Sequence, residues 1–199
     1  KRKSCFLYGV REPDLKCGEP RTRCQAAIEW QIEFEYPDGP QDCEAVAVDL
    51  PKNRVLLLSK RKKIPMLYAL PLNTRAGKRL TAKVMARVTT IPAPTAEDLE
   101  ERYGRYRSQP TSMDLSEDGR TLVILTYKRA YQYHRGPGRT WAEVLCQPPG
   151  LILLPPTDTA GLLQREAICI MPDSRGLMLT SEKRFAGIYT LLPKEREDE

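Results

Sequence analysis

The amino-acid sequence predicts an all-β fold built from repeated units of strands, and two observations support this. Residues 42–72, 111–134 and 166–192 resemble one another in the order of their apolar stretches and turns. The chain of 199 residues also contains 17 prolines and 12 glycines and little extended helical periodicity, which favours a fold rich in turns. Because each unit of a repeat fold must stack on its neighbours to bury its apolar faces, we interpret the units as blades of a β-propeller.

Three strands are expected in each repeat. In the first repeat they cover residues 44–48, 54–59 and 65–70, separated by a Pro/Asn turn and a basic turn. The matching first turns of the other repeats, at residues 118–120 and 173–175, contain Gly and Ser, which tight hairpins accept. The second strands, VLLLS, LVILT and LMLTS, are almost continuously apolar, which indicates burial on both faces. Three unrelated hairpins of an ordinary sandwich are the alternative.

A fourth, outermost strand is expected between the repeats, at residues 27–36, 80–91 and 150–155. The first two segments alternate apolar and polar side chains, as a strand with one solvent-exposed face does. Four strands per unit is the composition of a propeller blade. The sequence therefore predicts all-β, four-stranded blades.

The chain divides into four consecutive parts of one propeller domain. We expect the last strands of a preceding blade at 1–37, a blade at 38–92, a helical insertion and a blade at 93–155, and a final blade with a polar tail at 156–199. About three blades cannot close a ring. We therefore expect the C-terminal half of a propeller of about six blades, completed by missing N-terminal blades or by a second chain.

A short helix is expected inside the longest connection, residues 92–110. Thr95 can cap it with Asp98 three positions on, and Gly104 is expected to end it. A further helical turn is expected at residues 140–145. The insertion should lie across one face of the propeller.

Composition excludes several classes of function. No run of 18 apolar residues exists, so no membrane span is expected. The net charge of +6 is only mildly basic, and the run at residues 60–63 contains no aromatic residue, so nucleic-acid binding is not expected. The six cysteines form no C-x-x-C pair. Cys17 and Cys24 could form a local disulfide, and Cys169 is expected to be a buried apolar residue.

Candidate functional residues gather where the inner strands of a propeller begin. These strand starts carry Asp42, Glu44, Thr111, Arg165 and Glu166. The turns between second and third strands open onto the same face and carry Lys60, Arg61, Lys128, Arg129, Lys183 and Arg184. Converging carboxylates suit calcium, and a basic ring suits a phosphate or carboxylate ligand. Alternatively, the acids only hydrogen-bond the backbone and the basic turns only keep the surface soluble.

Other chemistry has little support in the sequence. The single histidine, His134, lies at a strand end without a recognisable catalytic partner. No glycine-rich phosphate-binding motif occurs. Hydrolytic triads and nucleotide binding are therefore not expected.

The stretches YPDGPQDCEAVAVDL, RYRSQPTSMDLSEDGRTLVILTYKRAY and EAICIMPDSRGLMLTSE resemble blades of uncharacterised bacterial β-propeller proteins that are often exported. The resemblance runs from about Tyr36 onward and implies a longer parent and a periplasmic or secreted location. More distantly, EAVAVD and EAICIM resemble inner strands of alkaline phytases, lactonases and other six-bladed propellers. The likeness to phytases, whose inner-strand carboxylates hold calcium that binds substrate phosphate, implies that Glu44 and Glu166 are ligands. Thr111 departs from this pattern.

Two functions are therefore expected. The first is a binding or scaffold protein that takes a small anionic ligand or a protein partner at the channel mouth. The second is a calcium-dependent phosphoester hydrolase, with metal ligands Asp42, Glu44 and Glu166 and anion-orienting residues Lys60, Arg61, Lys128 and Lys183. The hydrolase requires a cation between Glu44 and Glu166, whereas the binding protein requires a polar funnel without a metal.

Overall fold

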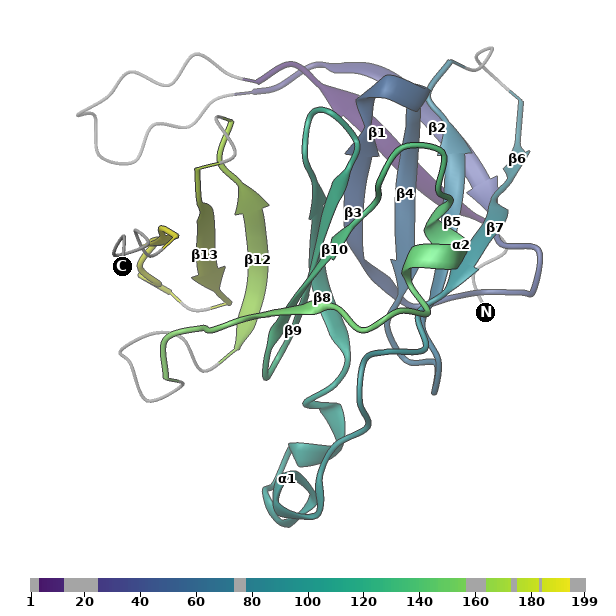
Figure 1. The fold of residues 1–199 in the computed structure, drawn as a ribbon. Coiled ribbons are helices and arrows are strands. Elements are labelled where there is room, and N and C mark those ends of the chain that lie inside the picture. The colour runs from purple at the N-terminus through teal and green to yellow at the C-terminus, as the bar shows by residue number, and fades with distance from the viewer. Residues whose placement is uncertain are drawn as a thin grey trace.

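The computed structural model describes residues 4–12, 25–73, 78–156, 164–172, 175–182 and 184–193. Within these ranges the chain is all-β, with 14 strands in four sheets and a few short helical turns (Figure 1). Neighbouring strands are antiparallel except for one short parallel pairing. No helix in the described ranges is long and apolar enough to cross a membrane.

The first sheet has the order β1-β2-β6 and contains β1 (Cys5–Val10), β2 (Ile28–Glu35) and β6 (Leu80–Thr81). The sequence predicts one outer strand over residues 80–91, but the structure divides this segment between two sheets. Leu80 and Thr81 pair in parallel with β2, and the chain then crosses to the second sheet as β7 (Lys83–Arg87). Ala82 lies at the crossing, almost fully buried, where its N–H donates to Glu35. A small apolar residue there lets one segment serve two sheets.

The second sheet contains the strands expected for the first repeat. Its order is β3-β4-β5-β7, with β3 (Cys43–Asp49), β4 (Arg54–Ser59) and β5 (Met66–Pro71). Between β3 and β4, a 3-10 turn, η1 (Leu50–Lys52), ends at Asn53 in the left-handed conformation, with φ of 47°. Asparagine tolerates this conformation better than most residues, which explains its place in the turn.

The third and fourth sheets follow in chain order. The third has the order β11-β10-β9-β8 and contains β8 (Pro110–Leu115), β9 (Thr121–Thr126), β10 (Ala130–His134) and β11 (Gly150–Ile152). The fourth contains β12 (Arg165–Ile170), β13 (Leu177–Ser181) and β14 (Tyr189–Leu191). The strands of the second and third repeats are thus where the sequence predicts them.

The sheets pack face to face, and each interface has its own apolar core. Side chains of β4 alternate between two of these cores: Val55 and Leu57 contact the first sheet's core, whereas Leu56 and Leu58 contact the core shared with the third sheet. This confirms the burial on both faces expected from the continuous apolar run. Side chains of β9, in the third sheet, alternate in the same way between the core shared with the second sheet and the core shared with the fourth.

The first strands of the three repeats, β3, β8 and β12, are called the inner strands here and are neighbours, with β8 in the middle (Figure 1). Side chains of β8 reach the backbone of β12: Asp114 accepts the N–H of Ile170 at 2.7 Å, and Ser112 accepts that of Ile168 at 3.2 Å. Cys169, expected to be buried, is exposed. Because side chains alternate along a strand, burying Ile168 against the fourth sheet's core turns Cys169 to the opposite face. Cys17 and Cys24 lie outside the described residues.

The insertion folds as α1 (Ala96–Glu100) and a 3-10 turn, η2 (Gly104–Tyr106). Thr95 and Asp98 form the expected capping box. The helix ends at Glu100, before Gly104, which instead begins η2 and packs against the Asp98 carbonyl so closely that any Cβ would overlap it. The second helix, α2 (Trp141–Val144), matches the expected turn and buries Trp141 between the second and third sheets.

Candidate functional site

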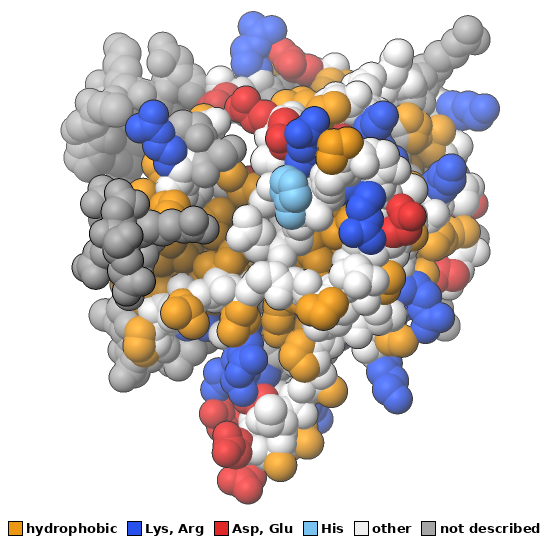
Figure 2. All heavy atoms as spheres, viewed as in Figure 1, with side chains coloured by type: hydrophobic (Ala, Val, Ile, Leu, Met, Phe, Trp, Pro, Cys, Tyr) orange, Lys and Arg blue, Asp and Glu red, His pale blue; other side chains and the backbone are white. Residues whose placement is uncertain are grey.

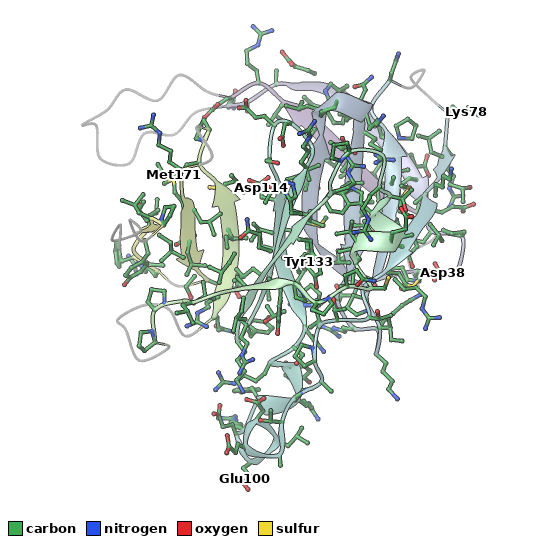
Figure 3. The ribbon with its side chains drawn as sticks, viewed as in Figure 1. Asp38, Lys78, Glu100, Asp114, Tyr133 and Met171 are labelled. Carbon is green, nitrogen blue, oxygen red and sulfur yellow. The ribbon has the colours of Figure 1, made fainter. Side chains whose placement is uncertain are left out.

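A pocket of about 780 Å³ lies at the end of the molecule where the inner strands begin and the insertion projects. The insertion forms the extension at the bottom of Figures 1 and 2, where basic and acidic side chains gather, and Glu100 marks its far tip in Figure 3. The lining residues come from the basic turn, the insertion and the strand starts: Lys60, Arg61, Glu101, Arg102, Tyr103, Tyr106, Arg107, Gln109, Tyr127 and Gln164.

Each inner strand begins with a β-bulge at an equivalent position. The pairing register shifts across Glu44 in β3, across Thr111 in β8 and across Glu166 in β12. A bulge re-aims a side chain out of the regular alternation. The three positions matched from the repeat therefore share one local geometry, although their surroundings differ.

The bulged glutamates are connected by Lys60 and Tyr127. The Lys60 ammonium donates to the Glu44 carboxylate and, at 2.8 Å, to the Tyr127 hydroxyl. It also lies 4.9 Å from the centre of the Tyr127 ring. Tyr127 also acts on Glu166, where its hydroxyl opposes the increase of the carboxyl pKa. Since an ammonium can only donate, the Tyr127 oxygen is the acceptor of the hydrogen bond from Lys60.

The pKa values of this network follow from burial and pairing. Burial alone would lower the pKa of Lys60, but the hydrogen bonds to Glu44 and Tyr127 and their charges raise it above its ordinary value. Burial raises the pKa of Glu166, against the opposing effects of Tyr127 and Lys60. Burial also raises the pKa of Tyr127. Lys60 is therefore a charged, paired side chain with only 7% of its surface exposed.

The insertion is attached to the third sheet through Lys128. The Lys128 ammonium donates to Asp98 at 2.6 Å, and its backbone N–H donates to the Arg107 carbonyl at 3.1 Å. The Lys128 carbonyl accepts from the buried Arg165 guanidinium at 2.7 Å. Lys128 thus contacts the insertion at α1 and just after η2, and it connects both places to the start of β12.

The pocket rim carries cations with different partners. Arg61 pairs with Asp42 at 2.6 Å, and Arg107 pairs with Glu101. Arg102 instead lies over the Tyr103 ring, 5.1 Å from its centre. In the part of the chain that the structure describes, Arg102 has no carboxylate partner. Its charge is the least compensated of those lining the pocket.

Several other residues that the sequence predicts as ligand-binding do not line the pocket. Thr111 is buried and donates its hydroxyl to the Arg165 carbonyl at 2.7 Å, so it joins β8 to β12 and cannot reach a ligand. Arg165 is likewise buried, and burial followed by the nearby Arg107 charge lowers its pKa. Arg129 and Arg184 are exposed but do not line the pocket. Lys183 lies outside the described residues.

Two of the three carboxylates predicted as calcium ligands are paired with cationic side chains. Glu44 accepts from the Lys60 ammonium, and Asp42 pairs with Arg61. Among the described residues, no three histidine, cysteine or carboxylate side chains converge as a metal site would require. Lys60 thus supplies a positive charge beside Glu44, where the sequence predicts a metal ion.

Sequence reasoning missed the aromatic part of the pocket. Tyr103, Tyr106 and Tyr127 line it together with Arg102 and Arg107. The stretch RYGRYR, in which tyrosine and arginine alternate, was the available signal. Its position predicts only part of a helical insertion, because no neighbouring residue indicates that its tyrosines line the same pocket as Lys60.

Comparison of the chain with protein-family models and with curated proteins gives no match. The properties of this pocket therefore rest on its own residues.

Proposed function

We propose that the four sheets are consecutive blades of a β-propeller and that the protein binds a small anionic ligand in the pocket beside the insertion. The observation that carries this proposal is the pocket itself, whose charged lining residues are Lys60, Arg61, Arg102 and Arg107 against the single carboxylate of Glu101. A protein partner that presents such an anionic group would use the same side chains.

The packing of the sheets supports the propeller. Four sheets stack face to face in chain order, and the repeats start with the adjacent strands β3, β8 and β12. In the second and third sheets the following strands add outward one after another. Propeller blades have this arrangement, and their channel mouths are common binding sites because loops from several blades meet there.

The charges favour an anion over a metal-dependent reaction. Glu44 and Tyr127 engage two of the three donors of the Lys60 ammonium and hold its charge in place beside the pocket. Arg102 has no carboxylate partner among the described residues, so its guanidinium donors suit the oxygens of a phosphate or carboxylate. With Lys60 engaged by Glu44, the geometry supports binding rather than calcium-dependent hydrolysis of a phosphoester.

An NMR titration of the ¹⁵N-labelled chain tests this function. We expect inorganic phosphate, glucose 6-phosphate or phenyl phosphate to shift amides of the insertion and the Lys60 turn saturably. Loss of one charged hydrogen-bond donor in Arg102→Gln should weaken binding by about tenfold. The matched control is Arg105→Gln, because Arg105 stacks on Tyr106 at 4.7 Å but does not line the pocket.

Two results would contradict the proposal. One is the absence of saturable shifts with all three anions. The other is an equal loss in the Arg102 and Arg105 variants, which would indicate a general charge effect rather than a site.

A further inference from the structure

We propose that the ligand is an aromatic anion, a planar ring that carries a phosphate, sulfonate or carboxylate group. This inference rests on the proposed function and specifies its ligand class. The anionic group would bind the Arg102 guanidinium, and the ring would pack against the pocket tyrosines.

The size of the pocket argues against a lone inorganic anion. Its volume is about 780 Å³, within the range of roughly 300–1,000 Å³ typical of sites for organic molecules. A water molecule occupies about 30 Å³ of liquid, and a phosphate ion displaces only a few waters. An inorganic anion would therefore leave most of the pocket to solvent, whereas a ligand with an organic body would fill it.

The aromatic lining indicates what that body is. Tyr103 follows α1, Tyr106 lies in η2 and Tyr127 follows β9, so three separate positions bring tyrosines to one pocket. Tyr103 is 63% exposed although it is a large aromatic residue. The Arg102 guanidinium lies over this ring. An aromatic ligand would replace water on the exposed ring surface in an offset or edge-to-face pair.

The hydroxyl of Tyr127 is already engaged, because it accepts from Lys60 at 2.8 Å, so this residue mainly offers its ring to a ligand. The hydroxyl groups of a sugar could find partners on Gln109 and Gln164. A sugar phosphate is therefore the competing ligand against which an aromatic anion is compared.

Arg102 and Tyr103 are adjacent in sequence and contact each other. Their contact therefore places a guanidinium that has no carboxylate partner in the described ranges directly beside an exposed ring at the pocket. A ligand in which the anionic group is attached to the ring, as in phenyl phosphate, can reach both at once. Tyr103 is thus assigned as a specificity-determining residue for the ring, distinct from the anion-binding role of Arg102.

The test compares phenyl phosphate, glucose 6-phosphate and inorganic phosphate on the full chain by NMR titration. We expect phenyl phosphate to bind at least about fivefold more tightly than either of the others, the gain expected from one aromatic pair. Tyr103→Leu should remove this preference, so that phenyl phosphate and inorganic phosphate bind this variant with similar affinities. Tyr103→Phe keeps the ring and should retain the preference, which separates ring contact from a fault in folding.

The outcomes separate this inference from the proposed function. Equal affinities for the three anions, or a preference for glucose 6-phosphate, with loss of binding in Arg102→Gln, would overturn the aromatic ligand and leave anion binding intact. A preference for phenyl phosphate that survives Tyr103→Leu would also overturn the role of Tyr103. No binding of any of the anions would overturn both proposals.

Discussion

Lys60 demonstrates how the surroundings decide the role of a single residue. It opens a run of four basic residues whose simplest interpretation is a solvated turn, yet its side chain is 7% exposed. An unpaired buried ammonium would be strongly unfavourable. Glu44 and Tyr127 offset that cost, and these partners lie 16 and 67 positions away in the sequence. Lys62 is also engaged, with Asp38 and Tyr68.

Removing the Tyr127 hydroxyl should raise the pKa of Glu166 further. Burial already raises this pKa, and the hydrogen bond from Tyr127 opposes the increase. In Tyr127→Phe only the burial and charge effects remain, and we expect a loss of about 1 kcal/mol of stability from the broken hydrogen bonds. A ¹³C NMR titration of the Glu166 carboxyl measures the pKa. Tyr106→Phe is the control, and an unchanged Glu166 pKa in Tyr127→Phe would contradict the network.

Among the elements, the short insertion depends on contacts beyond its own sequence. A five-residue helix is too short to be stable alone. Asp98 serves two purposes: it completes the capping box with Thr95 and accepts from Lys128. Gly104 allows the chain to pass against the Asp98 carbonyl. The pocket wall formed by Arg102 and Tyr103 therefore depends on contacts with the third sheet.

Asp98 should make this wall sensitive to acid. Burial acts to raise its pKa, but Lys128 and Thr95 dominate and lower it from 3.8 to about 2. Because the folded pKa lies below the ordinary value, the stabilisation is present above about pH 4 and is lost as the pH falls toward 2. We expect Asp98→Asn to cost about 1–2 kcal/mol at pH 7 and to reduce the stability loss between pH 4 and 2.

Urea denaturation at a series of pH values measures the effect of Asp98. The control is Glu97→Gln, a neighbouring exposed carboxylate in the same helical turn. If the two variants have the same stability at pH 7, Asp98 does not hold the insertion in place.

For the whole molecule, the four sheets are not equally well packed. The core between the second and third sheets contains aliphatic residues from the facing sides of both sheets, together with Trp141 from α2. The core between the third and fourth sheets is smaller among the described residues and contains Val123, Leu125, Ala130, Ile168 and Leu179. Less buried apolar area means less stabilisation, so the fourth sheet should open before the others.

Hydrogen exchange followed by mass spectrometry tests this order. We expect amides of β4, β5 and β9 to exchange slowest and those of β14 to exchange at least about 100-fold faster. The strands β4, β5 and β9 have hydrogen-bonded neighbours on both edges, whereas β14 has a neighbour on one edge in the described sheet. Uniform protection across the four sheets would instead indicate a single cooperative unit.

Much of the strand pattern could be predicted because it is a local property. The apolar runs of β4 and β9, the turn at Asn53 and the capping box at Thr95 each follow from neighbouring residues. The division of residues 80–91 between two sheets could not be predicted, because it depends on where Ala82 is buried. The exposure of Cys169 likewise depends on which face of β12 meets the core.

The sequence by itself determined the repeat, most of the strands and the capped helical turn of the insertion. Only the tertiary structure decided which candidates face the pocket. It buries Thr111 and Arg165, pairs Glu44 with Lys60 and adds Tyr103 and Tyr127. The physical reason is that hydrophobic periodicity acts over neighbouring residues, whereas charge pairing and burial depend on groups brought together from distant parts of the chain.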